Sequence, residues 1–215
     1  MGAIKFPHTS GNSMSIAAPA TNPASDLELK LPATIGTAGQ VLKNSSTPGT
    51  LEFGAGGGIT EADYWYVTQD YSAGDVTPLD ANISRMTTGP TSAPLGTGMS
   101  KSSGIWTFPS TGWWEVTVHI TFQIPANTAS NYCYVQTQGT TNNSAYSTLA
   151  EGYAHASEIN STHYSGADST LLLDITDTAN QKIKFNVDVE NNNVIVSGHS
   201  TVALTYFRFI KLAGT

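Results

Sequence analysis

The sequence IWTFPSTGWWEVTVHITF, residues 105–122, decides the fold of this chain. From Trp114 to Phe122 apolar side chains alternate with polar ones, which is the period of a strand that buries one face. A tight turn is expected before this strand, because Pro109 presets φ and Gly112 tolerates the chain reversal. We therefore predict a hairpin of two strands with a second sheet facing it, since a single hairpin is only marginally stable in water.

Other runs of apolar or alternating residues predict more strands. They are residues 64–67, 132–138, 183–189, 194–196 and 201–211, with a less regular run at 171–176 and a short one around 146–153. Residues 89–104 and most of 140–169 are predicted to be loop, because proline, glycine and polar residues dominate them. About eight strands without a convincing helix argue for an antiparallel β-sandwich.

The stretch F-P-S-T-G at residues 108–112, with the aromatic strand after it, resembles the central hairpin of the C1q/TNF-like jelly rolls. The resemblance continues through residues 131–135, 171–175, 182–187 and 200–212, and so covers roughly the last two thirds of the chain. It implies that the sandwich is a C1q/TNF-like jelly roll and that it assembles as a homotrimer.

Composition limits the classes of partner. Hydrophobic residues make up 39% of the 215 residues, enough for one core, but charged residues only 12%, about half the usual share. Serine, threonine, asparagine and glycine replace them, as is common in extracellular and virion β proteins. The net charge is −7 with scattered lysine and arginine, so we expect no nucleic-acid partner, because phosphate binding needs clustered cations. No apolar run approaches the ~20 residues of a membrane helix, so no membrane insertion is expected.

Residues 1–58 differ from the rest of the chain. Residues 1–25 show no sustained period, so we expect a larger assembly to hold them. The alternating DLELKL at 26–31 predicts a strand, and 41–42 and 51–53 predict two more around a turn at 47–49. The glycine-rich residues 54–58 predict a hinge. We therefore divide the chain into an N-terminal attachment arm, 1–58, and a jelly-roll head, 59–215.

The arm has a resemblance of its own. The pattern L-P-x-x-x-G-x-x-G-Q-V-L at residues 31–42, followed by L-x-F-G at 51–54, resembles a module of fibre and appendage proteins of tailed bacteriophages, cyanophages especially. The likeness covers about 30 residues. A generic β linker is the other interpretation of this stretch.

No motif predicts catalysis or a metal site. The sequence GHSTV at 198–202 lacks the last glycine of a G-x-S-x-G nucleophile elbow. Asp168, Asp174 and Asp177 lie at expected strand ends and turns, where aspartate is favoured for backbone hydrogen bonds. The five histidines lack zinc-ligand spacing, and no calcium loop of the D-x-D-x-D-G type occurs. We therefore expect no enzyme, no cofactor and no metal. The only cysteine, Cys133, is expected to be a buried thiol.

The charge of Arg208 predicts which way the last strand faces. An unpaired charge in a dry core costs several kcal/mol or more, so Arg208 should point outward. By alternation Leu204 and Tyr206 then point outward and Phe207 and Phe209 inward. In the 105–122 hairpin the same logic predicts the core residues Trp114, Val116, Val118 and Ile120, and leaves Glu115 and Thr117 outside.

The jelly-roll resemblance implies that this outer face lines a three-fold axis, with the two strands adjacent. The expected trimer-interface residues are Glu115, Thr117, Leu204, Tyr206 and Arg208, with a salt bridge between Glu115 and Arg208, within or between chains. An independent argument for an interface is that the last strand is apolar on both faces, which a solvated edge would not tolerate.

We expect a bacteriophage virion structural protein, assembled in the host cytoplasm without a signal peptide. The leading interpretation is a trimeric tail-fibre or appendage protein whose arm binds other virion proteins and whose head faces a host-surface polysaccharide or protein. A capsid decoration protein is the alternative, and the sequence does not separate capsid from tail. A secreted C1q-like recognition module is disfavoured by the missing signal peptide and collagen repeat. A polysaccharide hydrolase would need a carboxylate pair in a cleft.

Overall fold

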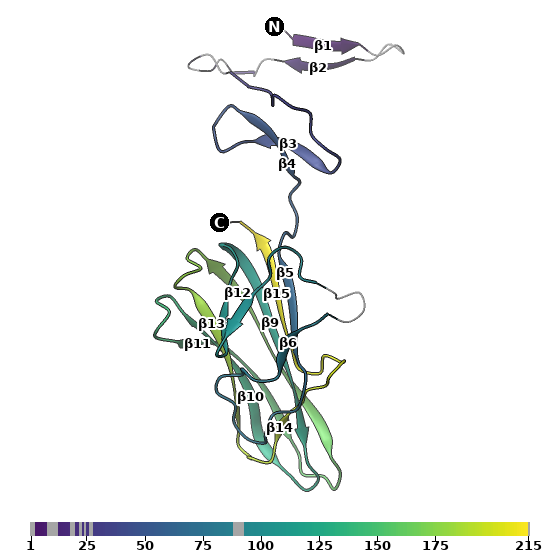
Figure 1. Cartoon of the computed structure of the whole chain (residues 1–215), viewed down its shortest axis with the longest axis vertical. Coiled ribbons are helices and arrows are strands. Elements are labelled where there is room, and N and C mark those ends of the chain that lie inside the picture. The colour runs from purple at the N-terminus through teal and green to yellow at the C-terminus, as the bar shows by residue number, and fades with distance from the viewer. Residues whose placement is uncertain are drawn as a thin grey trace. The chain divides into compact units, whose positions relative to one another are not determined.

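The computed structural model describes residues 3–7, 13–17, 20–21, 23, 25, 28–87 and 93–214. The chain separates into two compact units, with the boundary between Gly57 and Gly58. All elements in the described part are β-strands, fifteen in number (Figure 1).

The N-terminal unit contains two antiparallel pairs of strands. β1 (Ala3–Pro7) pairs with β2 (Ser13–Ala17), and β3 (Gln40–Asn44) pairs with β4 (Leu51–Ala55). The pair β3–β4 occupies the positions expected from the sequence, whereas β1 and β2 lie in a segment for which no strand was predicted.

The strand predicted at 26–31 is wrong over its described residues. Residues 28–31 form no strand, and only Lys30 makes an isolated bridge, to Thr50. Leu29 and Leu31 are 63% and 73% exposed. Alternation alone does not make a strand when no second layer covers its apolar side.

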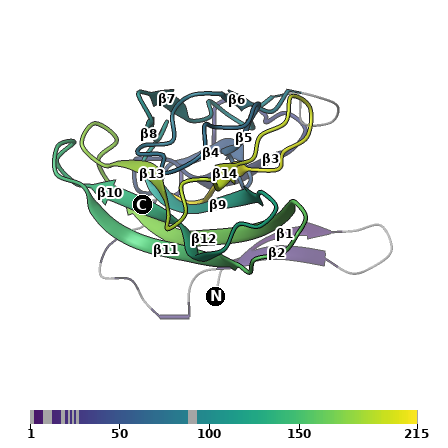
Figure 2. The same ribbon diagram turned by 90° about the horizontal axis from the view of Figure 1, so that it is seen from below.

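The C-terminal unit consists of two antiparallel sheets packed face to face (Figures 1 and 2). One sheet has the spatial order β11 (Ser147–Ala156), β10 (Ser130–Thr140), β13 (Lys182–Val189), β8 (Ile105–Thr107) and β7 (Ser100–Ser102). The other has the order β12 (His163–Ile175), β9 (Gly112–Ile124), β15 (Tyr206–Ala213), β5 (Ala62–Val67) and β6 (Ile83–Arg85), and β14 (Ile195–Val196) pairs with β9. This is a jelly roll.

The hairpin predicted at 105–122 is wrong in its pairing. Both strands exist, but β8 pairs with β13 and β7, while β9 pairs with β12 and β15, so the turn crosses from one sheet to the other. Phe108 and Trp114 are both fully buried, with ring centroids 5.3 Å apart. Gly112, at φ 141°, approaches the carbonyl oxygen of Ala213 so closely that a Cβ would lie 2.3 Å from it. The turn therefore closes one end of the core.

The core is centred on Trp106, which is fully buried. Its ring centroid lies 5.2 Å from that of Trp65, 5.3 Å from Phe207 and 4.9 Å from Phe209. Phe185, on β13 of the same sheet as Trp106, contacts both Trp106 and, across the core, Phe207 of β15. Aromatic pairs at these separations stabilise a core beyond the area they bury, so this cluster joins the two sheets. Cys133 is also buried, as expected, and burial raises the pKa of its thiol.

The short strand expected around 146–153 is present within β11, but the prediction of loop over most of 140–169 is wrong, because β11 continues to Ala156 and the first half of β12 also lies in this range. The two strands lie side by side where the sheets meet (Figures 1 and 2). A Cβ at Gly152 would lie only 1.9 Å from the carbonyl oxygen of Asp168. Buried positions here are small, including Ala156 and Ala167, so the first half of β12 lacks the alternating large apolar residues on which pattern recognition depends. Likewise β7 falls within the predicted loop 89–104.

Candidate functional site: an outer sheet face and a buried charge cluster

The outer face of the sheet β12–β9–β15–β5 carries three rows of side chains set by strand register. The first row is Ala62, Ile210, Glu115 and Leu172; the second is Tyr64, Arg208, Thr117 and Thr170; the third is Tyr66, Tyr206, His119 and Asp168. We call these twelve residues the outer face. Four of the five predicted interface residues belong to it.

Glu115 and Arg208 are in direct contact on the outer face. Arg208 Nη2 donates a hydrogen bond to Glu115 Oε1 at 2.8 Å and another to Thr117 Oγ1 at 3.2 Å. The side chains of Arg208 and Glu115 are 44% and 34% exposed. A pair this accessible contributes under ~1 kcal/mol within a single chain.

Leu204 does not belong to the strand on which it was placed. The last strand begins at Tyr206, not at 201, so the alternation that assigned Leu204 to the outer face does not reach it. Leu204 is partly buried in the preceding turn, where its carbonyl oxygen accepts a hydrogen bond from Thr121 Oγ1 at 2.8 Å. The turn takes its shape from this contact and from the hydrogen bond that the Thr121 backbone donates to Thr205 Oγ1.

Aromatic rings link the second and third rows. Tyr206 stacks on Tyr64 and on His119, each at a centroid distance of 5.2 Å. His119 Nδ1 lies 2.7 Å from Asp168 Oδ1. Burial and the nearby Tyr206 raise the pKa of Tyr64 to about 12, and the positive charge of Arg208 partly offsets the rise. Sequence reasoning identified Tyr206 but missed Tyr64 and His119, whose neighbourhood depends on pairing between distant strands.

The six predicted core residues, Trp114, Val116, Val118, Ile120, Phe207 and Phe209, all point between the sheets, with at most 1% of each exposed. Thr117, on the other side of β9, is only 8% exposed, because Arg208 and Thr170 contact its hydroxyl.

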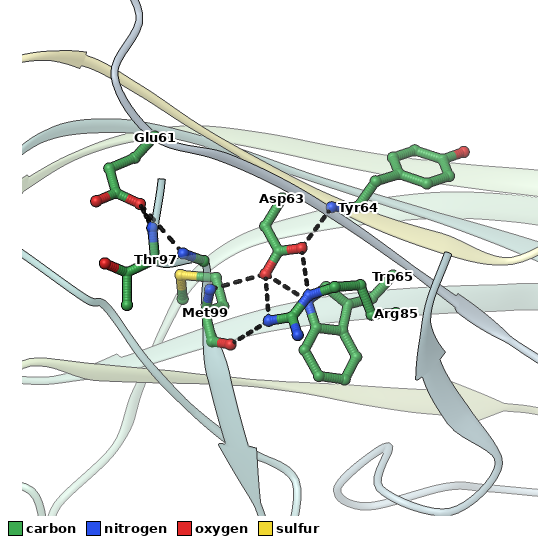
Figure 3. Close-up of polar contacts among 8 residues, drawn as sticks. Glu61, Asp63, Tyr64, Trp65, Arg85, Thr97 and Met99 are labelled. Carbon is green, nitrogen blue, oxygen red and sulfur yellow. Dashed lines mark hydrogen bonds and ion pairs between the residues drawn. The ribbon is translucent and has the colours of Figure 1, made fainter. Parts of the chain in front are cut away.

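A second group of charged residues lies on the inner side of the same sheet and was not predicted (Figure 3). The side chain of Asp63, on β5, is 1% exposed and accepts hydrogen bonds from Arg85 Nε at 2.9 Å and Arg85 Nη2 at 3.0 Å. It also accepts from Trp65 Nε1 at 2.7 Å and from the backbone nitrogens of Met99 and Tyr64 at 2.7 and 3.0 Å. Five donors replace the water that burial removes from this carboxylate.

This cluster ties a loop to the edge of the sheet. Arg85 Nη2 also donates to the carbonyl oxygen of Met99 at 2.8 Å, and its guanidinium lies 4.5 Å from the centroid of the Trp65 ring. Glu61 accepts hydrogen bonds from the backbone nitrogens of Thr97 and Gly98 (Figure 3). The site is therefore structural: it fixes residues 97–99 against β5 and β6.

The residues considered for catalysis have structural contacts instead. His199 Nδ1 accepts hydrogen bonds from the backbone nitrogens of Thr201 and Val202 at 3.2 Å each, and the carbonyl oxygen of Ser200 accepts one from Tyr66. Asp177 accepts a hydrogen bond from the side-chain amide of Asn180 and two more from the backbone nitrogens of Ala179 and Asn180, and these bonds lower the pKa of its carboxyl. Within the described ranges, no group of three or more His, Cys, Asp or Glu side chains converges as metal ligands would. Nor does that part of the chain contain a helix with the length and apolarity to cross a membrane.

Comparison with known proteins supports the fold. No family model matches the sequence, and no curated protein sequence matches it. Among solved structures, the chain is similar to the Eiger TNF from S. frugiperda, with a TM-score of 0.51 at 13% identity over 72% of this chain and 93% of that chain. Murine APRIL at pH 8.5 and at pH 5.0 gives TM-scores of 0.47 and 0.48 at 12% and 10% identity, covering 71% of this chain and 98% of that one. The C-terminal unit is thus a TNF-like jelly roll.

Proposed function

We propose that this chain is a structural protein of a tailed-bacteriophage virion: a trimeric tail-fibre or appendage protein that attaches to the particle through residues 1–58 and presents residues 59–215 to the host surface. The TNF-like head supports trimerisation, and the phage-like sequence pattern of the arm supports the virion.

The observation that carries the attachment role is the apolar surface of the arm. Ile35 is 93% exposed, and Leu31, Leu29, Leu42 and Val41 are between 73% and 46% exposed. Every residue of β3 is exposed. A segment of this size with so little buried surface gains most of its stability from what covers it, and other virion proteins are the proposed cover.

The observation that supports the trimer is the outer face itself. It combines stacked rings, the half-buried Ile210, the exposed Leu172 and a half-exposed ion pair. Three such faces meeting at an axis would bury the apolar residues while Arg208 keeps its carboxylate partner. Light scattering at micromolar concentration should give a molar mass of three times 22.6 kDa; a mass of one chain would refute the trimer.

Electron microscopy of particles labelled with an antibody against the head tests the location. Label at the tail or its appendages is the expected result. Label spread over the capsid would instead identify a decoration protein, the second candidate, which shares the arm and the trimer. A chain that labels no particle and is found free outside cells would favour the secreted recognition module.

A further inference from the structure

The outward side of the other sheet carries three neighbouring tyrosines. Tyr132 and Tyr134 lie two residues apart on β10, and Tyr153 lies opposite Tyr134 on β11. The ring centroids of Tyr132 and Tyr134 are 5.7 Å apart, and those of Tyr134 and Tyr153 are 5.0 Å apart. Tyr153 is 61% exposed and Tyr132 is 38% exposed. The fold does not need these rings for its core, since they point away from it.

Planar polar side chains border the rings in the same register. Asp188 on β13 lies opposite Tyr134, and Gln136 lies opposite Glu151. The Tyr153 hydroxyl donates a hydrogen bond to Glu151 Oε2, and Gln136 Nε2 donates to Glu151 Oε1 at 2.8 Å. We call Tyr132, Tyr134, Tyr153, Gln136, Glu151 and Asp188 the tyrosine platform.

The charge of the platform restricts what it can bind. Hydrogen bonds from Tyr153 and Gln136 lower the pKa of the Glu151 carboxyl, so it stays ionised at neutral pH. Lys184, further along β13, places its ammonium 4.7 Å from the centroid of the Tyr146 ring, and Lys182 donates to Thr107 and to the carbonyl oxygen of Thr178. Both lysines lie further along β13, opposite Gln138 and Thr140, whereas the charges beside the rings are the carboxylates of Glu151 and Asp188. These disfavour an anionic polymer and suit a neutral one.

The chemistry of the platform matches that of a sugar. The face of a tyrosine ring is electron-rich and attracts the partly positive C–H groups that line one side of a pyranose. Carboxylates accept hydrogen bonds from hydroxyl groups, and a glutamine side chain both donates and accepts. A protein partner fits less well, because the centre of a protein interface is depleted in charge, whereas carboxylates here alternate with the rings and none of the six residues is aliphatic.

We propose that the tyrosine platform binds a neutral polysaccharide, with the rings of Tyr132 and Tyr153 stacking on sugar faces and Glu151 and Asp188 accepting hydrogen bonds from sugar hydroxyls. The inference deepens the proposed function and rests on it, since the polysaccharide is assigned to the host surface.

The test measures binding of the full chain to immobilised dextran, mannan and galactan, with polygalacturonate as the anionic polymer. The full chain should bind at least one neutral polymer and not polygalacturonate. Tyr132→Ala and Tyr153→Ala should each weaken that binding about tenfold, as truncation of an aromatic anchor does. Tyr164→Ala is the matched control, since Tyr164 is also 61% exposed but lies on β12 in the other sheet; its binding should stay within about twofold of wild type.

Binding to none of the three neutral polymers, or binding unchanged in both platform variants, would overturn the inference. A parallel assay separates this failure from failure of the proposed function: fluorescent full chain is added to cells that the particle infects. If the chain binds those cells and both platform variants bind equally well, attachment stands and the platform is not its site. Loss of cell binding after protease treatment would identify a protein receptor and also overturn the inference. If the wild-type chain does not bind the cells, the attachment function itself fails.

Discussion

Two arginine–carboxylate pairs lie on opposite faces of one sheet, and they differ mainly in burial. Asp63 and Arg85 are 1% and 29% exposed on the inner side, whereas Glu115 and Arg208 are 34% and 44% exposed on the outer side. The inner carboxylate accepts five hydrogen bonds from within the chain. The outer carboxylate accepts one from its arginine. The inner pair is therefore complete in one chain, and the outer pair has room for a second chain to cover it.

The difference shows how to recognise an interface in a single protomer. A buried charge must be satisfied within the chain that buries it, because an unpaired one costs several kcal/mol. A half-exposed pair among stacked aromatic rings still has water, and loses it only when another surface arrives. Removing one partner of the outer pair should therefore change the stability of the assembled trimer, whereas removing one partner of the inner pair should change the stability of the head in a single chain.

The largest effect is expected at the inner pair. Asp63→Ala leaves Arg85 without its carboxylate and frees two backbone nitrogens, so the free energy of unfolding should fall by ~3–5 kcal/mol. Urea unfolding followed by tryptophan fluorescence measures it. The double variant Asp63→Ala/Arg85→Ala should cost less than the two single variants added together, because each single change already breaks the pair. Additive losses would mean that the two residues are not coupled.

The outer pair should respond only when the chains are assembled. In the trimer, Glu115→Ala should destabilise the assembly by ~3–5 kcal/mol if the axis is dry. The same variant, unfolded at a dilution where light scattering gives the mass of one chain, should lose under ~1 kcal/mol. A loss under ~1 kcal/mol in both states would show that the pair stays in water and that the axis is wet rather than dry.

A smaller effect is expected from the tyrosine beside the outer pair. The pKa of Tyr64 is raised to about 12 in the folded chain, above the unfolded value near 10. The stabilisation that the protonated Tyr64 hydroxyl gives the folded state is therefore complete below pH ~10. It is lost as pH rises through the folded pKa, because the unfolded chain releases the proton first. Since Tyr64 is partly exposed, we expect a loss under ~1 kcal/mol.

Urea unfolding midpoints of wild type and Tyr64→Phe are compared between pH 9 and 11. Because the variant lacks only the Tyr64 hydroxyl, the difference between the two proteins separates the effect of Tyr64 from that of the other tyrosines. The wild type should lose slightly more stability than the variant over that range. Parallel curves for the two proteins would contradict the shift assigned to Tyr64.

The smallest effect on either pair is expected from removing the arm. Both pairs belong to the unit that starts at Gly58. Deletion of residues 1–58 should therefore change the unfolding free energy of the head by no more than ~0.5 kcal/mol relative to the full chain, and the truncated head should still be a trimer. The same deletion should abolish incorporation into particles. A truncated head that still co-sediments with virions would overturn the division into attachment arm and head.

Much of the buried surface was predictable because burial in a strand has a local period. Alternation along β9 assigned Trp114, Val116, Val118 and Ile120 to the core, and no information beyond neighbouring residues was needed. The contact between Glu115 and Arg208 was predictable for a different reason. It needed the resemblance to the jelly rolls, which supplied the adjacency of two strands 93 residues apart along the chain.

Where a local period was missing, the sequence was misleading. β11 and β12 are built around glycine and alanine at the edge where the two sheets meet, and Gly152 is needed there because Asp168 approaches its Cα. Small residues give no hydrophobic pattern, so the first half of β12 was predicted as loop, although strands were expected around 146–153 and at 171–176. In the arm, residues 28–31 have the alternating apolar and polar pattern of a strand, but no second layer of structure covers their apolar side chains, so the strand did not form.

The amino-acid order alone determined the class of fold, the inward parity of the core strands and the different character of residues 1–58, because each depends on side chains close together in sequence. Only the tertiary structure decided that β8 and β9 belong to different sheets, that Asp63 is buried against Arg85, and that Tyr132, Tyr134 and Tyr153 share one face. Strand pairing is a choice among distant segments that present the same local pattern. It is settled by the packing of the whole core, in which one tryptophan, Trp106, contacts both sheets at once.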